Sequence, residues 1–136
     1  MRTPTLIPAA IVMTILSLTI SHSTPMHYQS IPAVEASEMI INDSSVVLLD
    51  VRTPGEYAGE LGHLEGAILI PVQELAARVG ELDAIKGKEI LVYCRSGRRS
   101  LTASDILQQN GHSAINVEGG MVEWNELKLP GVEYHK

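Results

Sequence analysis

Apolar residues along this chain fall into short continuous runs that alternate with longer stretches of helical spacing. The runs have the length and the aliphatic content of strands that are buried on both faces. They cover residues 46–49, 67–70, 89–93 and 114–117. The stretches between them repeat their apolar residues at the spacing of an amphipathic helix. They cover residues 33–41, 72–85, 98–110 and 121–127. In the helix at 98–110 we expect Leu101, Ile106 and Leu107 to face inward.

This alternation predicts an α/β fold, with a central, mostly parallel sheet and helices on both faces. In such sheets, ligands bind at the edge where the strands have their carboxyl ends. Asp50 and Cys94 each follow directly on a predicted strand. We therefore expect one pocket at this edge to hold both residues.

Residues 1–23 form a segment with a composition of its own. A brief positive start with Arg2 precedes residues 6–20, which carry no charge, and small residues follow at Ser21 and Ser23. This pattern predicts a signal peptide over residues 1–23 that is cleaved before Thr24. A flexible lead over residues 24–30 and one domain over residues 31–136 would then remain, in a periplasmic or secreted protein. The alternative is an uncleaved membrane anchor at residues 6–20, although that run is shorter than the ~20 residues of a typical span.

Charge and composition exclude several function classes. A formal net charge of -6 argues against general binding of nucleic acid, and the single cysteine excludes an internal disulfide. The five histidines show no metal-ligand spacing, and there is no Walker-type phosphate loop. The sequence therefore predicts neither a metal nor a cofactor.

Cys94 is the strongest candidate for chemistry. It ends an apolar strand-like run, and a short polar loop with Gly97 follows before the helix that begins near Arg98. Backbone N–H groups in such a loop, together with a helix N-terminus, favour a thiolate over a thiol. The alternative is a small core cysteine, which is the usual role of a lone cysteine. That alternative does not explain the arginine-rich loop after it.

The chain resembles a single-domain rhodanese, a thiosulfate sulfurtransferase. Four sequence blocks carry the resemblance, and they occur in the same order as in the family. They are residues 48–52 with Glu56 and Tyr57, residues 62–67, the active-site loop at 94–100, and Gly119-Gly120 with Trp124 and residues 129–131. There are departures from the family pattern. Glu65 replaces a proline, and the connection at 58–61 is slightly longer, and we expect neither to affect the chemistry. Arg99 stands where larger two-domain members carry a threonine, so that threonine's role is not carried over.

The resemblance implies covalent catalysis without a cofactor. Cys94 would take a sulfane sulfur from a thiosulfate-like donor and pass it to cyanide, a thiol or a thioredoxin-like acceptor. The backbone of the loop would cradle the persulfide. Asp50 would hold the loop, Arg52 would make internal ion pairs, and His63 would be structural. The loop residues expected to bind substrate are Arg95, Ser96, Gly97, Arg98, Arg99 and Ser100.

The arginines have a simpler alternative role, as solvated surface charge or as partners of Asp50 or Glu56. Two other functions also stay open. A rhodanese-related phosphatase or arsenate reductase would use a longer loop with its arginine one position later than Arg99. A non-catalytic binding module would be expected to lack the cysteine or the loop. Contact with a membrane is expected only if residues 6–20 remain attached.

Overall fold

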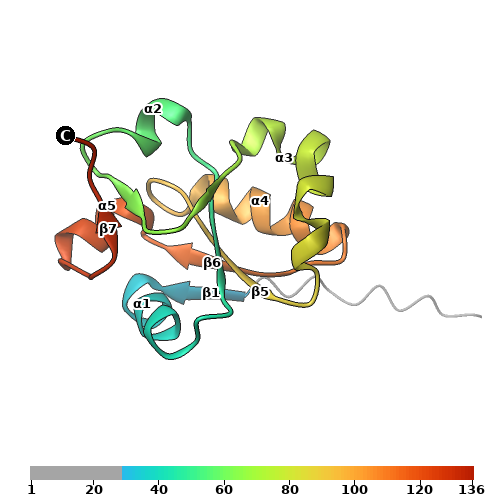
Figure 1. Ribbon diagram of the computed structural model, residues 1–136, viewed down its shortest axis with the longest axis horizontal. Helices are drawn as coiled ribbons and strands as arrows, with labels where there is room; N and C mark the ends of the chain where they lie inside the picture. The colour runs from blue at the N-terminus through green and yellow to red at the C-terminus, as the bar shows by residue number, and fades with distance from the viewer. Residues whose placement is uncertain (1–28) are drawn as a thin grey trace, which may run out of the picture.

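The computed structural model describes residues 29–136, which fold into alternating strands and helices (Figure 1). In chain order the elements are β1 (Gln29–Pro32), α1 (Ala33–Asn42), β2 (Val47–Asp50), α2 (Pro54–Tyr57), β3 (His63–Leu64), β4 (Ile68–Leu69), α3 (Val72–Arg78), the 3-10 helix η1 (Val79–Ile85), β5 (Glu89–Tyr93), α4 (Arg98–Gln109), β6 (Ser113–Glu118), α5 (Gly120–Glu126) and β7 (Val132–Glu133). The helix predicted over residues 72–85 therefore changes from α to 3-10 geometry next to Gly80.

The central sheet has the order β1-β6-β5-β2-β4, and all of its strand pairs are parallel. This confirms the predicted α/β class. Strand β5 lies in the middle of the sheet, between β6 and β2. Its carboxyl end therefore delivers Cys94 to the edge where the turn after β2 also lies.

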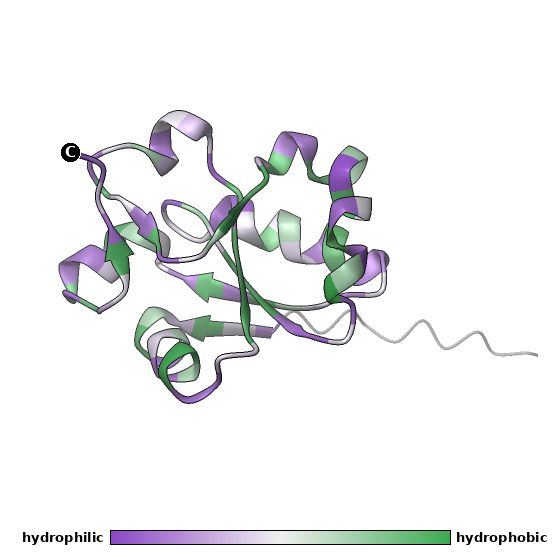
Figure 2. Ribbon diagram, viewed as in Figure 1, coloured by the Kyte–Doolittle hydropathy of each residue, from purple (hydrophilic) through white to green (hydrophobic). Residues whose placement is uncertain are grey.

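Helices cover both faces of the sheet, because successive side chains of a strand point to opposite faces. Leu91 and Tyr93 of β5 pack into a cluster with residues of α1 and α5, whereas Ile90 and Val92 pack with residues of α3, η1 and α4. Figure 1 shows α1 on the opposite side of the sheet from α3 and α4. Hydrophobic residues are concentrated on the central strands, and hydrophilic residues on the outer helices and loops (Figure 2).

Two expectations about local structure were wrong. Leu101 is 41% exposed, whereas Leu107 is buried and Ile106 packs against the core as expected. The other buried residues of α4 are Ser100, Ala103 and Ser104. These residues are mostly small, so the helix lies close to the sheet. Two further strands, β3 and β7, also lie outside the four ranges where strands were expected, and they form a separate antiparallel pair.

The first described strand includes two residues that lie before the predicted start of the domain. Gln29 and Ser30, which the sequence assigned to a flexible lead, pair in β1 with Ile115 and Asn116 of β6. The predicted signal peptide lies outside the described residues. Between residues 29 and 136, none of the helices has both the length and the apolar character needed to cross a membrane.

Candidate active site

The thiol of Cys94 lies at the base of a tight loop between β5 and α4. The side chain is 1% exposed. Its Sγ accepts a hydrogen bond from the Gly97 backbone N–H at 3.1 Å and lies 3.4 Å from the Ser100 hydroxyl oxygen. Gly97 has a φ of 94° and caps the N-terminus of α4. The left-handed backbone at Gly97 turns the chain so that the start of α4 faces the sulfur.

These contacts favour the ionised form of the thiol. Burial alone would raise the pKa of Cys94, but hydrogen bonds outweigh it and hold the pKa below its ordinary value. The donors are the Ser100 hydroxyl and the backbone N–H groups of Ser100, Ser96 and Gly97. The loop is therefore built to stabilise negative charge on sulfur, as the sequence predicted.

We expect the thiolate of Cys94 to form at a lower pH than that of a free thiol. Its ultraviolet absorbance should rise with pH through a midpoint below about 8.5, the value of an unperturbed cysteine. The measurement is a difference titration against Cys94→Ser, which removes the tyrosine background. A midpoint at or above that of a free thiol would contradict the assigned hydrogen bonds.

The active-site loop rests directly on the start of α5. Met121 and Val122 donate their backbone N–H groups to the carbonyl oxygens of Cys94 and Arg95, each at 3.0 Å. Gly120 has a φ of 54°, and a Cβ at this position would overlap the backbone of Cys94 and Arg95. Gly119-Gly120 lies in one of the blocks identified in the sequence, but the sequence did not indicate that α5 supports the active-site loop at this point.

Asp50 and Arg52 form a buried ion pair at the turn after β2. The Arg52 Nη2 donates to the Asp50 Oδ2 at 2.7 Å, and the two side chains are 1% and 0% exposed. Burial alone would lower the pKa of Arg52, but the bonded carboxylate raises it. Arg52 also donates to the Gly62 carbonyl oxygen at 2.8 Å. The internal ion pair expected of Arg52 is present, whereas Asp50 holds this turn and makes no hydrogen bond to residues 94–100.

The three arginines of the loop have different surroundings. Arg99 makes a two-pronged ion pair with Glu56 at 2.7 and 2.8 Å, which was the alternative role considered for it. This contact lowers the pKa of Glu56 to about 2. Arg95 and Arg98 are exposed, and neither forms an ion pair within residues 29–136.

Glu56 was not among the predicted site residues, although its spacing from Thr53 is that of a capping box. Thr53 accepts from the Glu56 backbone N–H at 3.2 Å, and the Glu56 carboxylate accepts from the Thr53 backbone at 3.3 Å. The same carboxylate holds Arg99. Glu56 therefore joins helix α2 to the start of α4.

A hollow of about 290 Å³ opens beside Arg95, at the edge expected for a ligand. We call it the Arg95 hollow. It is lined by Arg52, Thr53, Gly55, Glu56, Gly59, Glu60, Leu61 and Arg95.

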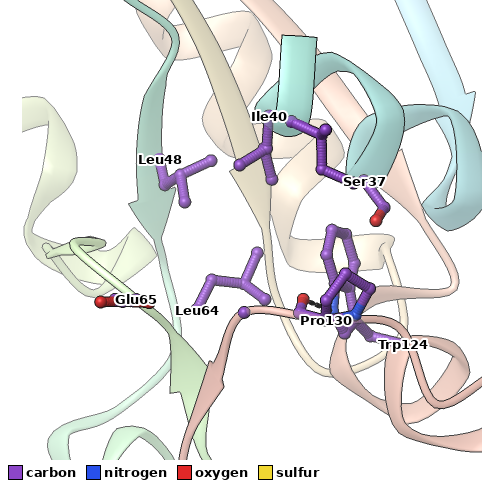
Figure 3. Close-up of a pocket in the computed structure, with 9 residues that line it drawn as sticks. Ser37, Ile40, Leu48, Leu64, Glu65, Trp124 and Pro130 are labelled. Carbon is purple, nitrogen blue, oxygen red and sulfur yellow. Dashed lines mark hydrogen bonds between the residues drawn. The ribbon is translucent and has the colours of Figure 1, made fainter. Parts of the chain in front are cut away.

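A second, more apolar cavity of about 190 Å³ lies beneath α1. Figure 3 shows Ile40, Leu48, Leu64 and Trp124 around it. None of residues 94–100 lines this cavity. Of the two, the Arg95 hollow is therefore the one that borders the cysteine loop, through Arg95.

His63 has a structural position, as expected. Its Nδ1 lies 3.1 Å from the Tyr57 carbonyl oxygen, and its Nε2 lies 2.9 Å from the carboxylate of Glu133 in β7. In the part of the chain that the structure describes, no group of three or more metal-ligating side chains is placed to hold a metal ion.

Comparisons of the sequence and of the structure with known proteins indicate the same family. The model of the rhodanese-like domain matches residues 32–127. The chain is 34% identical over 95 residues to the sulfurtransferase of Allochromatium vinosum, covering 69% of this chain and 85% of that one. It is 34% identical over 85 residues to the thiosulfate sulfurtransferase PspE of Escherichia coli, covering 62% of this chain and 77% of that one. The crystal structure of a rhodanese-like domain protein from Staphylococcus aureus superposes with a TM-score of 0.67 at 30% identity, covering 79% of this chain and 99% of that one. The parallel sheet, the cysteine loop and these matches together place the chain in the rhodanese-like domain family.

Proposed function

We propose that this protein is a sulfurtransferase of the rhodanese type, which moves a sulfane sulfur through a persulfide on Cys94. One observation carries the proposal: the Cys94 Sγ receives hydrogen bonds from the loop at the N-terminus of α4. A sulfur anion is the species that such a site stabilises. The names of the sulfurtransferase relatives from Allochromatium vinosum and Escherichia coli support the same class of reaction.

The reaction has two displacement steps. In the first, the Cys94 thiolate attacks the outer sulfur of thiosulfate, the bond between the two thiosulfate sulfurs breaks, and sulfite leaves with the electron pair. In the second, cyanide or an acceptor thiolate attacks the outer sulfur of the persulfide. The Cys94–sulfur bond then breaks, and its electron pair returns to Cys94. Splitting the transfer in this way is ordinary covalent catalysis.

The surroundings of the loop suggest which groups hold the donor. A guanidinium suits the oxygens of thiosulfate. Arg99 is bound to Glu56, whereas Arg95, the residue after Cys94, is exposed and lines the hollow. Arg95 is therefore the favoured contact for the sulfonate, whereas Arg98 does not line the hollow, and a polysulfide would use the same site.

The geometry disfavours the two competing functions. A related phosphatase would carry its loop arginine one position after Arg99, where this chain has Ser100, and Arg99 itself is bound to Glu56. A non-catalytic binding module would be expected to lack the cysteine or the loop, and this chain has both. We retain the export prediction as part of the proposal, with a periplasmic or secreted protein acting on small donors and on thiol or thioredoxin-like acceptors.

Intact mass measures the proposed intermediate directly. After incubation with thiosulfate, the protein should gain the mass of one sulfur atom and should lose it on addition of cyanide. The control is Cys94→Ser, which should gain nothing. Because Cys94 is the only cysteine, the site of addition is unambiguous. No gain of sulfur from thiosulfate or polysulfide would overturn the proposed function.

A further inference from the structure

The connection between α2 and β3 contributes a wall of the Arg95 hollow. This connection, residues 58–61, is slightly longer than in the rhodanese pattern. We expected this difference to have no effect on the chemistry. The structure instead places Gly59, Glu60 and Leu61 around the same hollow as Arg95. This connection therefore borders the same hollow as Arg95, the residue that follows Cys94 in the chain.

Some charged side chains that line the hollow are already in ion pairs, and the others are available to a ligand. The side chains of Arg52, Glu56, Glu60 and Arg95 carry the charge that lines the hollow. Arg52 is bound to Asp50, and Glu56 is bound to Arg99. Glu60 and Arg95 are exposed and make no ion pair within residues 29–136. The hollow thus presents one available carboxylate and one available guanidinium.

The backbone on either side of Glu60 is fixed by hydrogen bonds. Gly59 N–H donates to the Glu56 carbonyl oxygen, and Gly62 N–H donates to the Gly59 carbonyl oxygen, each at 3.0 Å. The Asn125 side chain of α5 donates to the Leu61 carbonyl oxygen at 3.0 Å. Glu60 is therefore presented from a constrained turn, which reduces the entropic cost of using it in binding.

We infer that Glu60 and Arg95 select acceptor thiols that carry both an ammonium group and a carboxylate. Glu60 would hold the ammonium group and Arg95 the carboxylate, with the thiolate directed at the Cys94 persulfide. The thiolate attacks the outer sulfur, the Cys94–sulfur bond breaks with its electron pair going to Cys94, and the acceptor leaves as a persulfide. This inference rests on the proposed function and narrows its acceptor class.

The test measures only the second half of the reaction. Persulfide is first formed with thiosulfate, the excess donor is removed, and the rate of sulfur discharge is measured with free cysteine and with β-mercaptopropionate, which lacks the ammonium group. Comparing each variant with the unmodified protein cancels the intrinsic reactivity of the thiols. Glu60→Gln should lower the preference for cysteine over β-mercaptopropionate by about two- to fivefold, the size of an exposed charge pair. Arg95→Gln should similarly lower the preference for cysteine over cysteamine, which lacks the carboxylate.

Glu65→Gln is the matched control, because Glu65 is exposed on the same part of the chain and does not line the hollow. An unchanged preference in Glu60→Gln, or an equal change in Glu65→Gln, would overturn the inference while leaving the proposed function intact. Failure to form any persulfide would instead defeat the proposed function, and the acceptor assignment with it.

Discussion

Replacing Asp50 with asparagine is expected to lower the free energy of unfolding by about 3–5 kcal/mol, since removing one partner of a buried ion pair leaves the other charge uncompensated. Asp50 and Arg52 are both almost fully buried, and the Asp50 carboxylate accepts from the backbone as well as from the guanidinium of Arg52. Asparagine keeps the shape but not the charge. Denaturant unfolding should show a lower midpoint with an unchanged slope.

A surface pair provides the control for this experiment. Arg78 and Glu81 lie 2.7 Å apart, but their side chains are 36% and 54% exposed. Glu81→Gln should cost less than about 1 kcal/mol. The double change Asp50→Asn with Arg52→Met should recover stability relative to Asp50→Asn alone, because it also removes the stranded charge. Equal costs for Asp50→Asn and Glu81→Gln would show that the buried pair is not what stabilises this turn.

The sequence predicted the parts of the fold that depend on local pattern. Strand β5 is a continuous apolar run, and its alternate side chains pack on opposite faces as a central parallel strand requires. The polar loop after Cys94 was also predicted from local sequence, because a cysteine in the core would not be followed by arginines. The local sequence also accounts for the short helix α2, because Thr53, Pro54 and Glu56 form its capping signal.

The features that the sequence did not predict depend on distant contacts. Strands β3 and β7 have no recognisable pattern of their own and exist because they pair with each other. Leu101 was misplaced because hydrophobicity alone suggested a leucine for the buried face, whereas close packing selects Ala103 and the serines on either side of it. The role inferred for Glu60 could not be predicted from the sequence, because the sequence does not show which neighbouring charges are already paired.

The active-site loop is supported from two sides by segments far from it in sequence. Glu56 of α2 holds Arg99, the second residue of α4. The start of α5 holds the other end, because Met121 and Val122 donate their backbone N–H groups to the carbonyl oxygens of Cys94 and Arg95. The loop geometry that favours a thiolate therefore depends on contacts from both segments. We expect displacement of either segment to disturb the hydrogen bonds to the Cys94 sulfur.

Gly120→Ala should therefore abolish most of the persulfide formation. A Cβ at residue 120 would overlap the carbonyl oxygens of Cys94 and Arg95, which are backbone atoms and cannot rotate aside. Displacing a reacting group by about 1 Å can cost on the order of 100-fold in rate. We expect a loss of at least that order in the rate at which thiosulfate adds sulfur to Cys94, measured by intact mass over time. The ultraviolet titration of Cys94 should also move toward higher pH, because the N–H groups would no longer be aligned on the sulfur.

Gly87→Ala separates this clash from the cost of a left-handed backbone. Gly87 has a φ of 90°, but a Cβ there would meet no atom within 4 Å, and the residue lies before β5, at the opposite end of the strand from Cys94. It should lose about 1–2 kcal/mol of stability from the backbone conformation alone. Persulfide formation should be retained in folded Gly87→Ala and lost in folded Gly120→Ala. If the two variants lost activity only in proportion to their stability, the start of α5 would have no specific role in shaping the thiolate site.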